Sequence, residues 1–476
     1  MIFVYTSTPS SFPEEGIAQD QNLHVVCGGQ RIGNNSANLI KGVHKDFVGT
    51  SNRVLKNASW IIVCRIAQSL VALVIGMITA RYLGPSNYGL LNYASSVVAF
   101  AVPLAQLGLR NVLVEEIISH PEREGKTLGT SLVMSVVSSL LCIIGCVAFV
   151  AVVNAGERET LIVCALYSIS LVFQMTEMIQ YWYQAKLLSK YTSLVSLAAY
   201  TVVALYKVFL LVTGKSIYWF AVSYAFDFLI ISVALLVLYQ KLGNQKLSFS
   251  VSLGKQLFFR SKYYIISSMM VTVFAQTDKI MIKMMIGNAE NGYYSTAIAC
   301  AGMTGFVFVA VIDSLRPVIF ESKQVDYQKF EQNMSILYSV ILHMGLIQSL
   351  LLTLFAKPIV SILYGEAYLA AIPLLQIITW YSAFSYMGSV RNIWMLAEEK
   401  QKYLWIINLS GAVLNVVGNF ILIPLMGAAG AAIASVATQF FTNFILCLLI
   451  KPIRPTAKLI MRALDPRLPF KMLRHK

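Results

Sequence analysis

The stretches "LGPSNYGLLNYA", residues Leu83 to Ala94, and "IGNAENGYYSTA", residues Ile286 to Ala297, share one pattern and lie 203 residues apart. In each, a branched aliphatic residue is followed by Gly, four residues, a second Gly, four residues and Ala. Turns at a membrane surface often contain Gly, Asn and Tyr, so the similarity could also arise from turn chemistry alone. The spacing favours the other interpretation, in which two similar halves each carry this turn.

The composition indicates a membrane protein. The 476 residues are 57% hydrophobic and 12% charged, whereas soluble globular chains carry about 25% charged residues. A helix that crosses a bilayer core of about 30 Å needs roughly 20 apolar residues. The sequence therefore predicts an all-α polytopic membrane protein with about 12 transmembrane helices, centred near Leu70, Val102, Leu140, Val172, Ala199, Ile230, Met270, Gly305, Leu346, Ile378, Leu414 and Ser435.

The net charge of +15 is explained by topology rather than by nucleic-acid binding. If the first helix starts in the cytoplasm, 29 of the 37 Lys and Arg residues lie on the cytoplasmic side and 4 lie on the opposite side. Cytoplasmic loops of membrane proteins are enriched in Lys and Arg. We therefore expect both termini in the cytoplasm and no nucleic-acid partner.

The two repeated turns fall between predicted helices one and two and between helices seven and eight. Because six crossings return a chain to its starting side, the two halves have the same orientation. Transporters are built in this way, with the substrate path between the halves. The predicted segments are a disordered cytoplasmic extension (1–53), a six-helix lobe (54–240), a basic cytoplasmic linker (241–262), a second six-helix lobe (263–450) and a basic cytoplasmic tail (451–476).

Several charged residues lie inside predicted helices, where an unpaired charge costs several kcal/mol and therefore indicates function. Cations at this depth attract a phosphate or pyrophosphate group. Arg65, Lys207 and Lys279 are accordingly the candidate residues for binding a substrate's pyrophosphate or sugar.

The carboxylates Asp227, Asp278 and Glu177 are candidates for ion coupling or for charge pairing. Structural roles also remain open: Asp278 with Lys279 could form an ion-pair site between helices, and Lys207 could simply pair with Asp227. Lys283 could extend to the outer membrane surface.

The sequence contains no P-loop and no zinc-ligand spacing. We therefore expect no cofactor, no metal site and no catalytic residue, and energy input must come from an ion gradient, the membrane potential or the substrate gradient.

Four stretches together resemble signatures of the polysaccharide transporter family, the O-antigen and exopolysaccharide flippases of bacteria, within the multidrug/oligosaccharidyl-lipid/polysaccharide exporter superfamily. The resemblance runs from about Val54 to Ile450, and Lys283 departs from it because family members more often have an apolar or small residue there. The stretches are "RYLGPSNYGLLNYASSVVAFAVPLAQLGLRNVLVEEI", "TDKIMIKMMIGNAENGYYSTA", "LYGEAYLAAIPLLQIITWY" and "LNVVGNFILIPLMGAAGAAIASVATQF".

This resemblance implies a V-shaped, two-lobed bundle in a bacterial inner or plasma membrane. It implies an alternating-access flippase, not an enzyme, that carries a polyprenyl-pyrophosphate-linked oligosaccharide outward for surface polysaccharide biosynthesis. Membrane lipids would surround it, and a polysaccharide polymerase and a chain-length regulator would be its partners. The alternative is an ion-coupled small-molecule or multidrug exporter on the same fold. A membrane glycosyltransferase is a third hypothesis, but the sequence lacks the large outer loop or DxD motif expected of one.

Overall fold

The computed structural model describes the backbone of residues 36–243, 245–465 and 467–468, and within these ranges it describes the side chains of residue 64 and of residues 67 onward. Contacts divide the chain into two units, Met1–Lys56 and Asn57–Lys476. The described part is helical and contains no strand. This agrees with the all-α prediction, because only helices and closed barrels satisfy every backbone polar group inside a bilayer.

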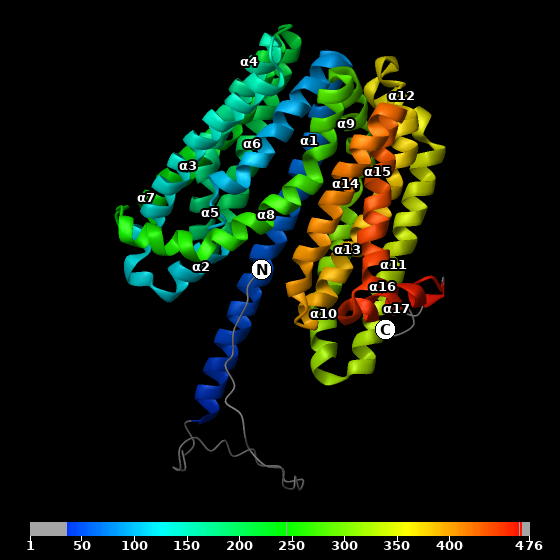
Figure 1. Ribbon diagram of the computed structural model, residues 1–476. Helices are drawn as coiled ribbons and strands as arrows, with labels where there is room; N and C mark the ends of the chain where they lie inside the picture. The colour runs from blue at the N-terminus through cyan, green and yellow to red at the C-terminus, as the bar shows by residue number, and fades with distance from the viewer. Residues whose placement is uncertain (1–35, 244, 466, 469–476) are drawn as a thin grey trace. The chain divides into compact units, whose positions relative to one another are not determined.

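Seven α-helices precede the predicted linker (Figure 1). They are α1 (Ser36–Ala105), α2 (Arg110–Ser119), α3 (Glu124–Val153), α4 (Arg158–Ser168), α5 (Met175–Ala185), α6 (Ser189–Val212) and α7 (Ile217–Leu242). Short 3-10 helices cover Pro121–Arg123 and Ile169–Gln174.

The remaining helices begin with α8 (Val251–Ile286), which is 36 residues long. Then follow α9 (Asn288–Gly302), α10 (Gly305–Val325), α11 (Tyr327–Leu354), α12 (Ala356–Tyr364), α13 (Ala371–Ala397), α14 (Leu404–Met426), α15 (Ala428–Phe440), α16 (Leu446–Leu449) and α17 (Arg454–Ala463). A π-helix, Phe441–Ile445, joins α15 to α16, and 3-10 helices cover Glu366–Tyr368, Gln401–Tyr403 and Lys451–Ile453.

Nine helical stretches in the described part of the chain are long and apolar enough to cross a membrane, or ten if the bent pair α9 and α10 counts as one span. The count of nine differs from the expected twelve at three places, one of which is the bent pair α9 and α10. The first two predicted helices are counted together in one stretch, Ala67–Ser119, although the backbone at Gly84, with φ 71° and ψ 170°, is not helical and kinks α1 between them. The predicted tenth helix, α13, is present but is not among these candidates.

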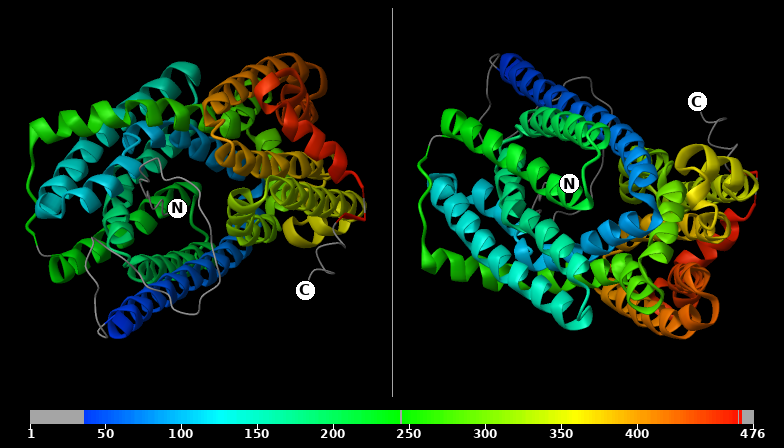
Figure 2. Two further views of the ribbon diagram at one scale, coloured as in Figure 1. Left: turned by 90° about the horizontal axis from the view of Figure 1, so that it is seen from below. Right: turned by 90° about the horizontal axis from the view of Figure 1, so that it is seen from above.

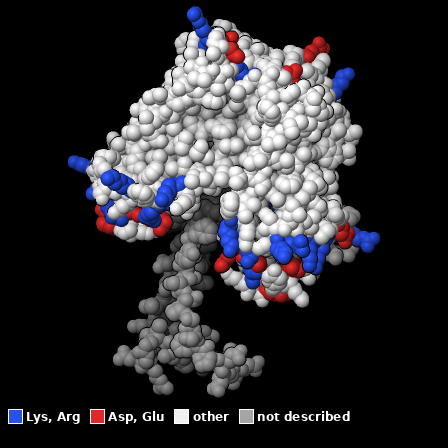
Figure 3. Space-filling model, in the orientation of Figure 1, with Lys and Arg blue, Asp and Glu red and all other residues white. Residues whose placement is uncertain are grey.

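Figure 3 agrees with a membrane location, because on the visible face the charged residues gather at the two ends and a broad uncharged band separates them. We name these two ends of the molecule the Gly84 end and the Glu116 end. The Gly84 end holds Gly84, Glu157, Lys215 and Gly287, and the Glu116 end holds Glu116, Glu124 and Arg260.

Helices pack mostly with neighbours from their own side of α8. Before it, α2 packs on α5, α3 on α4, and α6 on α7; after it, α11 packs on α13, α13 on α9, and α14 on α15. Both views in Figure 2 show the yellow-to-red helices next to one another. The long helix α8 contacts both sets, because it packs on α2 and α3 as well as on α9 and α14.

Candidate functional site

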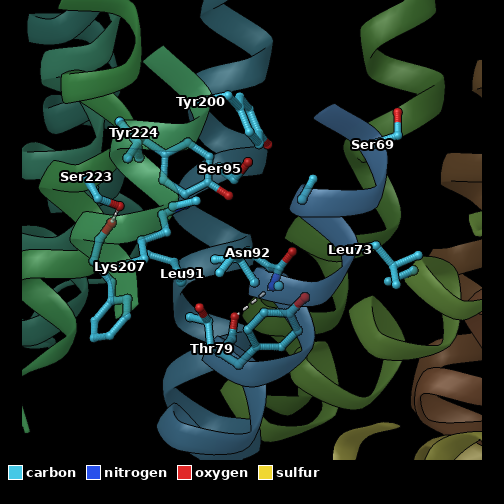
Figure 4. Close-up of a pocket in the computed structure, with 18 of the residues that line it drawn as sticks. Ser69, Leu73, Thr79, Leu91, Asn92, Ser95, Tyr200, Lys207, Ser223 and Tyr224 are labelled. Carbon is cyan, nitrogen blue, oxygen red and sulfur yellow. Dashed lines mark hydrogen bonds between the residues drawn. The ribbon is translucent and has the colours of Figure 1, made fainter. Parts of the chain in front are cut away.

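A cavity of about 500 Å³ lies between α1, α6, α7 and the region where α9 meets α10 (Figure 4). Hydroxyl and amide groups make up much of its wall, which suits a ligand rich in hydrogen-bonding groups. Its polar lining residues are Ser69, Thr79, Tyr88, Asn92, Ser95, Tyr200, Lys207, Ser223, Tyr224, Asp227 and Tyr364.

The structure brings Lys207 of α6 and Asp227 of α7 into this same cavity. The Lys207 ammonium lies 4.6 Å from the centroid of the Tyr224 ring, a favourable cation–π arrangement. Asp227 Oδ1 is buried and accepts no hydrogen bond from the described residues. No ion pair within 4.0 Å joins the two in the described part of the chain, but the Lys207 charge acts on the Asp227 carboxylate across the cavity.

Asp278 of α8 lies elsewhere, in a second cavity of about 210 Å³ that is also lined by Tyr294 and Ser435. Only 7% of Asp278 is exposed. Its Oδ1 accepts hydrogen bonds from Asn415 Nδ2 at 2.9 Å and Asn419 Nδ2 at 2.6 Å, and its Oδ2 accepts from the hydroxyls of Ser435 and Tyr294. Four donors from three other helices therefore surround one carboxylate.

Lys279 follows Asp278 in α8 but does not share these contacts. Among the residues that the structure describes, its ammonium has neither a hydrogen bond nor an ion pair. It is influenced by the negative charge of the neighbouring Asp278. The donors around Asp278 thus come from α9, α14 and α15 rather than from Lys279.

Two predicted site residues, Glu177 and Arg65, remain. Glu177 of α5 is partly buried and is not among the residues that line either cavity. The side chain of Arg65 lies outside the described residues.

The two repeated stretches contact each other directly at the Gly84 end. A Cβ atom on Gly89 would lie 1.8 Å from the carbonyl oxygen of Asn288, and a Cβ atom on Gly292 would lie 2.0 Å from that of Pro85. The two contacts are equivalent under the repeat, because Asn288 follows Pro85 by the same 203 residues that separate Gly292 from Gly89. Asn291 Nδ2 also donates to the Gly89 carbonyl at 2.7 Å. Only glycine allows the backbones to approach this closely.

Further hydrogen bonds join α1 to helices that follow α8 at the same end. The Tyr368 hydroxyl donates to the Ala80 carbonyl at 2.6 Å, and Arg81 Nη2 donates to the Ile362 carbonyl at 2.5 Å. Sequence reasoning identified the repeated turns but did not predict that they meet. The sequence did contain a signal for this contact, because the second glycine has the same position in each stretch.

Lys283 is also part of this end, where its ammonium is held in an ion pair and is not exposed. Only 4% of the residue is exposed, and its ammonium lies 2.5 Å from Glu157 Oε2, in the turn between α3 and α4. It also lies 5.0 Å from the centroid of the Tyr93 ring. The apolar surroundings make pairing with Glu157 more favourable than exposure.

The Glu157–Lys283 pair predicts a pH-dependent contribution to stability. Burial opposes ionisation of Glu157, but hydrogen bonds from Lys283 and Thr160 outweigh it and lower the pKa of the carboxyl below its ordinary value of 4.5. The contribution is therefore complete above pH 4.5 and is lost as the pH falls through the lowered pKa. Glu157→Gln should remove it and reduce the free energy of unfolding by about 1–2 kcal/mol, less than for a fully buried pair because Glu157 is half exposed.

Thermal unfolding of the detergent-solubilised protein between pH 3 and pH 7 measures this effect. Glu159→Gln, a change at an exposed residue of the same region, is the matched control and should leave the profile unchanged. Equal profiles for wild type and Glu157→Gln would show that the pair contributes nothing.

Arg391 is a buried charge that joins two elements. It lies in α13 and is 4% exposed. Its Nη1 donates to the Thr442 carbonyl at 2.9 Å and to Asn443 Oδ1 at 2.7 Å, both in the π-helix. A π-helix leaves backbone carbonyls without their usual donors, and Arg391 supplies one.

This helical arrangement is similar to the folds of several solved membrane proteins. The structure is similar to that of the lipid II flippase MurJ in an inward closed conformation, with a TM-score of 0.64 and 15% identity over 87% of this chain and 93% of that chain. It is also similar to an inward-facing multidrug resistance MATE family transporter, with a TM-score of 0.62 and 14% identity over 82% and 95% of the two chains. A transporter of the MOP superfamily from Pyrococcus furiosus is similar as well, with a TM-score of 0.57 and 13% identity over 85% of this chain and 96% of that chain.

The sequence comparisons identify the family. The chain belongs to the polysaccharide biosynthesis protein family, whose model matches residues 54–323. It is also 26% identical over 241 residues to an uncharacterized membrane protein of Methanocaldococcus jannaschii, and the match covers 47% of each chain. The chain thus spans about half the length of this curated relative. The chain is thus a multi-pass membrane protein of this family, and its fold is similar to those of the solved flippase and exporters.

Proposed function

We propose that this protein is an alternating-access flippase for a polyprenyl-pyrophosphate-linked oligosaccharide. It moves this repeat unit from the cytoplasmic to the outer leaflet of a bacterial cell membrane for surface polysaccharide biosynthesis. In this proposal both termini are cytoplasmic, as the distribution of Lys and Arg predicts, and the Gly84 end faces outward. The two sets of helices on either side of α8 act as the moving lobes.

The cavity lined by Lys207 and Asp227 carries this proposal. Sugar hydroxyls both donate and accept hydrogen bonds. The hydroxyls and amides that line the cavity can accept from them and donate to them, and the carboxylate can accept from them. The Lys207 ammonium supplies the positive charge that a pyrophosphate needs. The contacts at Gly89 and Gly292 close the Gly84 end, so a ligand in the cavity is shielded from that side.

Lys207→Gln tests the role of the cavity. Loss of one charge-assisted hydrogen bond costs about 1.5–3 kcal/mol, so flux should fall about 10- to 100-fold. The measurement is surface polysaccharide in a deletion strain complemented with each variant at equal protein level, together with lipid-linked oligosaccharide that accumulates inside. Lys215→Gln, at an exposed lysine at the Gly84 end, should complement fully. Full activity of Lys207→Gln would contradict the proposal.

The runner-up is an exporter of organic cations, and the buried, unpartnered Asp227 Oδ1 favours it, because this oxygen could bind an ammonium group. If this function is correct, overexpression raises drug resistance, Asp227→Asn abolishes that resistance, and deletion leaves polysaccharide export unchanged. The flippase proposal expects the opposite result in all three measurements.

We propose further that Asp278 is the ion-coupling residue. A buried carboxylate in a membrane-spanning helix can bind and release a proton or a sodium ion, and the four surrounding donors hold the Asp278 side chain in position. Its separate cavity allows the ion and the substrate to bind at different places in the same molecule.

A further inference from the structure

The last turns of α8 lie between two sets of helices, a first set that precedes α8 and a second set that follows it. Asp278 accepts hydrogen bonds from α9, α14 and α15 of the second set, and the buried Ile282 belongs to a hydrophobic core made mainly of residues of that set. Ile280 packs instead against a core made of residues of the first set. At 3.6 residues per turn, Ile280 lies on the face of α8 opposite Asp278 and Ile282. This segment therefore contacts both sets, and four hydrogen bonds join it to the second.

Lys283, five residues after Asp278, makes a charged contact between this segment and the first set. Its side chain is 2% exposed, and its ammonium lies 2.5 Å from Glu157 Oε2 in the turn between α3 and α4. The ammonium also lies 5.0 Å from the centroid of the Tyr93 ring of α1. Because the hydrogen bonds of Asp278 tie the segment to the second set, the ion pair joins the two sets at the Gly84 end. A movement that separates the two sets at this end must break the pair.

The ammonium is received by four residues of the first set, which we call the Lys283 socket: Tyr93, Asn154, Glu157 and Thr160. The Tyr93 hydroxyl donates to Asn154 Oδ1 at 2.7 Å, and Asn154 Nδ2 donates to Glu157 Oε1 at 3.4 Å. The Thr160 hydroxyl donates to Glu157 Oε2 at 2.6 Å. None of these three hydrogen bonds involves Lys283. The socket therefore keeps its shape when Lys283 leaves and can receive it again.

We propose that Lys283 and its socket form a releasable latch, in which the ion pair holds the Gly84 end closed and its release is a step in the opening of that end. This inference rests on the proposed alternating access and not on the identity of the transported molecule. Lys283 is a positioning residue, because it acts through Glu157 and not through contact with a substrate. The contacts of Gly89 and Gly292 close the same end by shape, whereas the latch adds a charge attraction that opening must overcome.

The partial exposure of the pair suits a latch that opens repeatedly. An ion pair that is fully exposed contributes little, because water solvates both partners when they separate. A fully buried pair is costly to break, because each partner leaves the other as an unpaired buried charge. In this pair 49% of the Glu157 side chain is exposed while Lys283 is buried, so water reaches one partner only. We expect the pair to favour the closed form over the open form by about 10-fold.

Gly76→Cys provides a readout of opening that does not depend on transport. Gly76 lines the cavity of about 500 Å³, and a Cβ atom there would meet nothing within 4 Å. In a variant without the native cysteines, a membrane-impermeant thiol reagent added outside spheroplasts reaches this position when the Gly84 end is open. Glu157→Gln and Lys283→Met, each added to this background, should increase the labelling rate about 10-fold.

Two controls separate a latch from a general loss of structure. Glu159→Gln changes an exposed carboxylate two residues from Glu157 and should leave the labelling rate unchanged. The double variant Glu157→Gln with Lys283→Met should label about 10-fold faster than the background and not about 100-fold faster, because removal of the second partner has nothing further to break. Labelling is quantified on protein recovered as a single species in size-exclusion chromatography, which leaves unfolded protein out of the comparison.

The background labelling rate in both single variants would overturn the proposal, and so would effects that multiply in the double variant. The failure of the latch and the failure of the proposed function are distinguishable. If the wild-type protein moves no lipid-linked oligosaccharide in proteoliposomes but both single variants label faster, the proposed substrate is wrong and the latch is supported. If the wild-type protein moves that substrate and neither single variant labels faster, the proposed function is supported and the latch is wrong.

Discussion

Replacing Gly89 or Gly292 with alanine should remove the closed arrangement at the Gly84 end. The added Cβ atoms would lie 1.8 Å and 2.0 Å from backbone carbonyl oxygens of the opposite stretch, and backbone cannot move aside as a flexible side chain can. We expect each change to destabilise the closed state by about 3 kcal/mol or more, which corresponds to a roughly 100-fold change in its population. Transport should fall by a similar factor, because the cycle needs this state.

Distances between spin labels at Glu159 and Lys357, two exposed positions, measure this closure in a variant that lacks the native cysteines. The distance should increase in Gly89→Ala and in Gly292→Ala. Gly145→Ala, where the added Cβ atom has no neighbour within 4 Å, should keep the wild-type distance and transport rate. Unchanged distances in both test variants would contradict the direct contact between the repeats.

Asp278→Asn should have the second large effect, on transport more than on folding. The amide keeps the shape of the side chain but removes the charge, and it places a donor where Asn415 and Asn419, or Ser435 and Tyr294, already donate. Flux in proteoliposomes should fall about 100-fold, and the residual flux should no longer depend on an imposed proton or sodium gradient. Which of the two gradients drives the wild-type protein identifies the ion.

Asp278→Ala separates the structural part of this role. It leaves four buried donors without an acceptor, and the expected loss of stability is about 3–5 kcal/mol. Asp313→Asn is the control, because Asp313 is half exposed and pairs with Arg316 on its own helix at 3.0 Å. If Asp278→Asn transported normally under both gradients, the coupling role of Asp278 would be refuted.

The sequence predicted the features that repeat or that depend on length and apolarity. Apolar runs of about 20 residues identified the helical stretches, and the repeated glycines located the two equivalent turns. Lys207 and Asp227 were selected because charges are costly in a membrane, and the structure places both in the cavity of about 500 Å³.

Features that depend on contacts between distant helices could not be read in the same way. Asn415 and Asn419 are four residues apart and so lie on one face of α14, but the sequence does not say that this face meets Asp278 of α8. The sequence likewise does not show that Arg391 of α13 donates to the π-helix, because no local pattern predicts a π-helix. The sequence does not reveal the partner of Lys283 either, because Glu157 is 126 residues away.

The length of α8 has a mechanical consequence. Its 36 residues give a helix of about 54 Å, longer than a bilayer core of about 30 Å. Near its start Arg260 pairs with Glu116 of α2, whereas near its end Asp278 accepts hydrogen bonds from α14 and Lys283 pairs with Glu157 in the turn between α3 and α4. If the two sets of helices move apart during transport as proposed, α8 must bend or release some of these contacts. We expect the bend near Ser267 and Ser268, which are exposed and lie against a cavity of about 480 Å³ between α1 and α8.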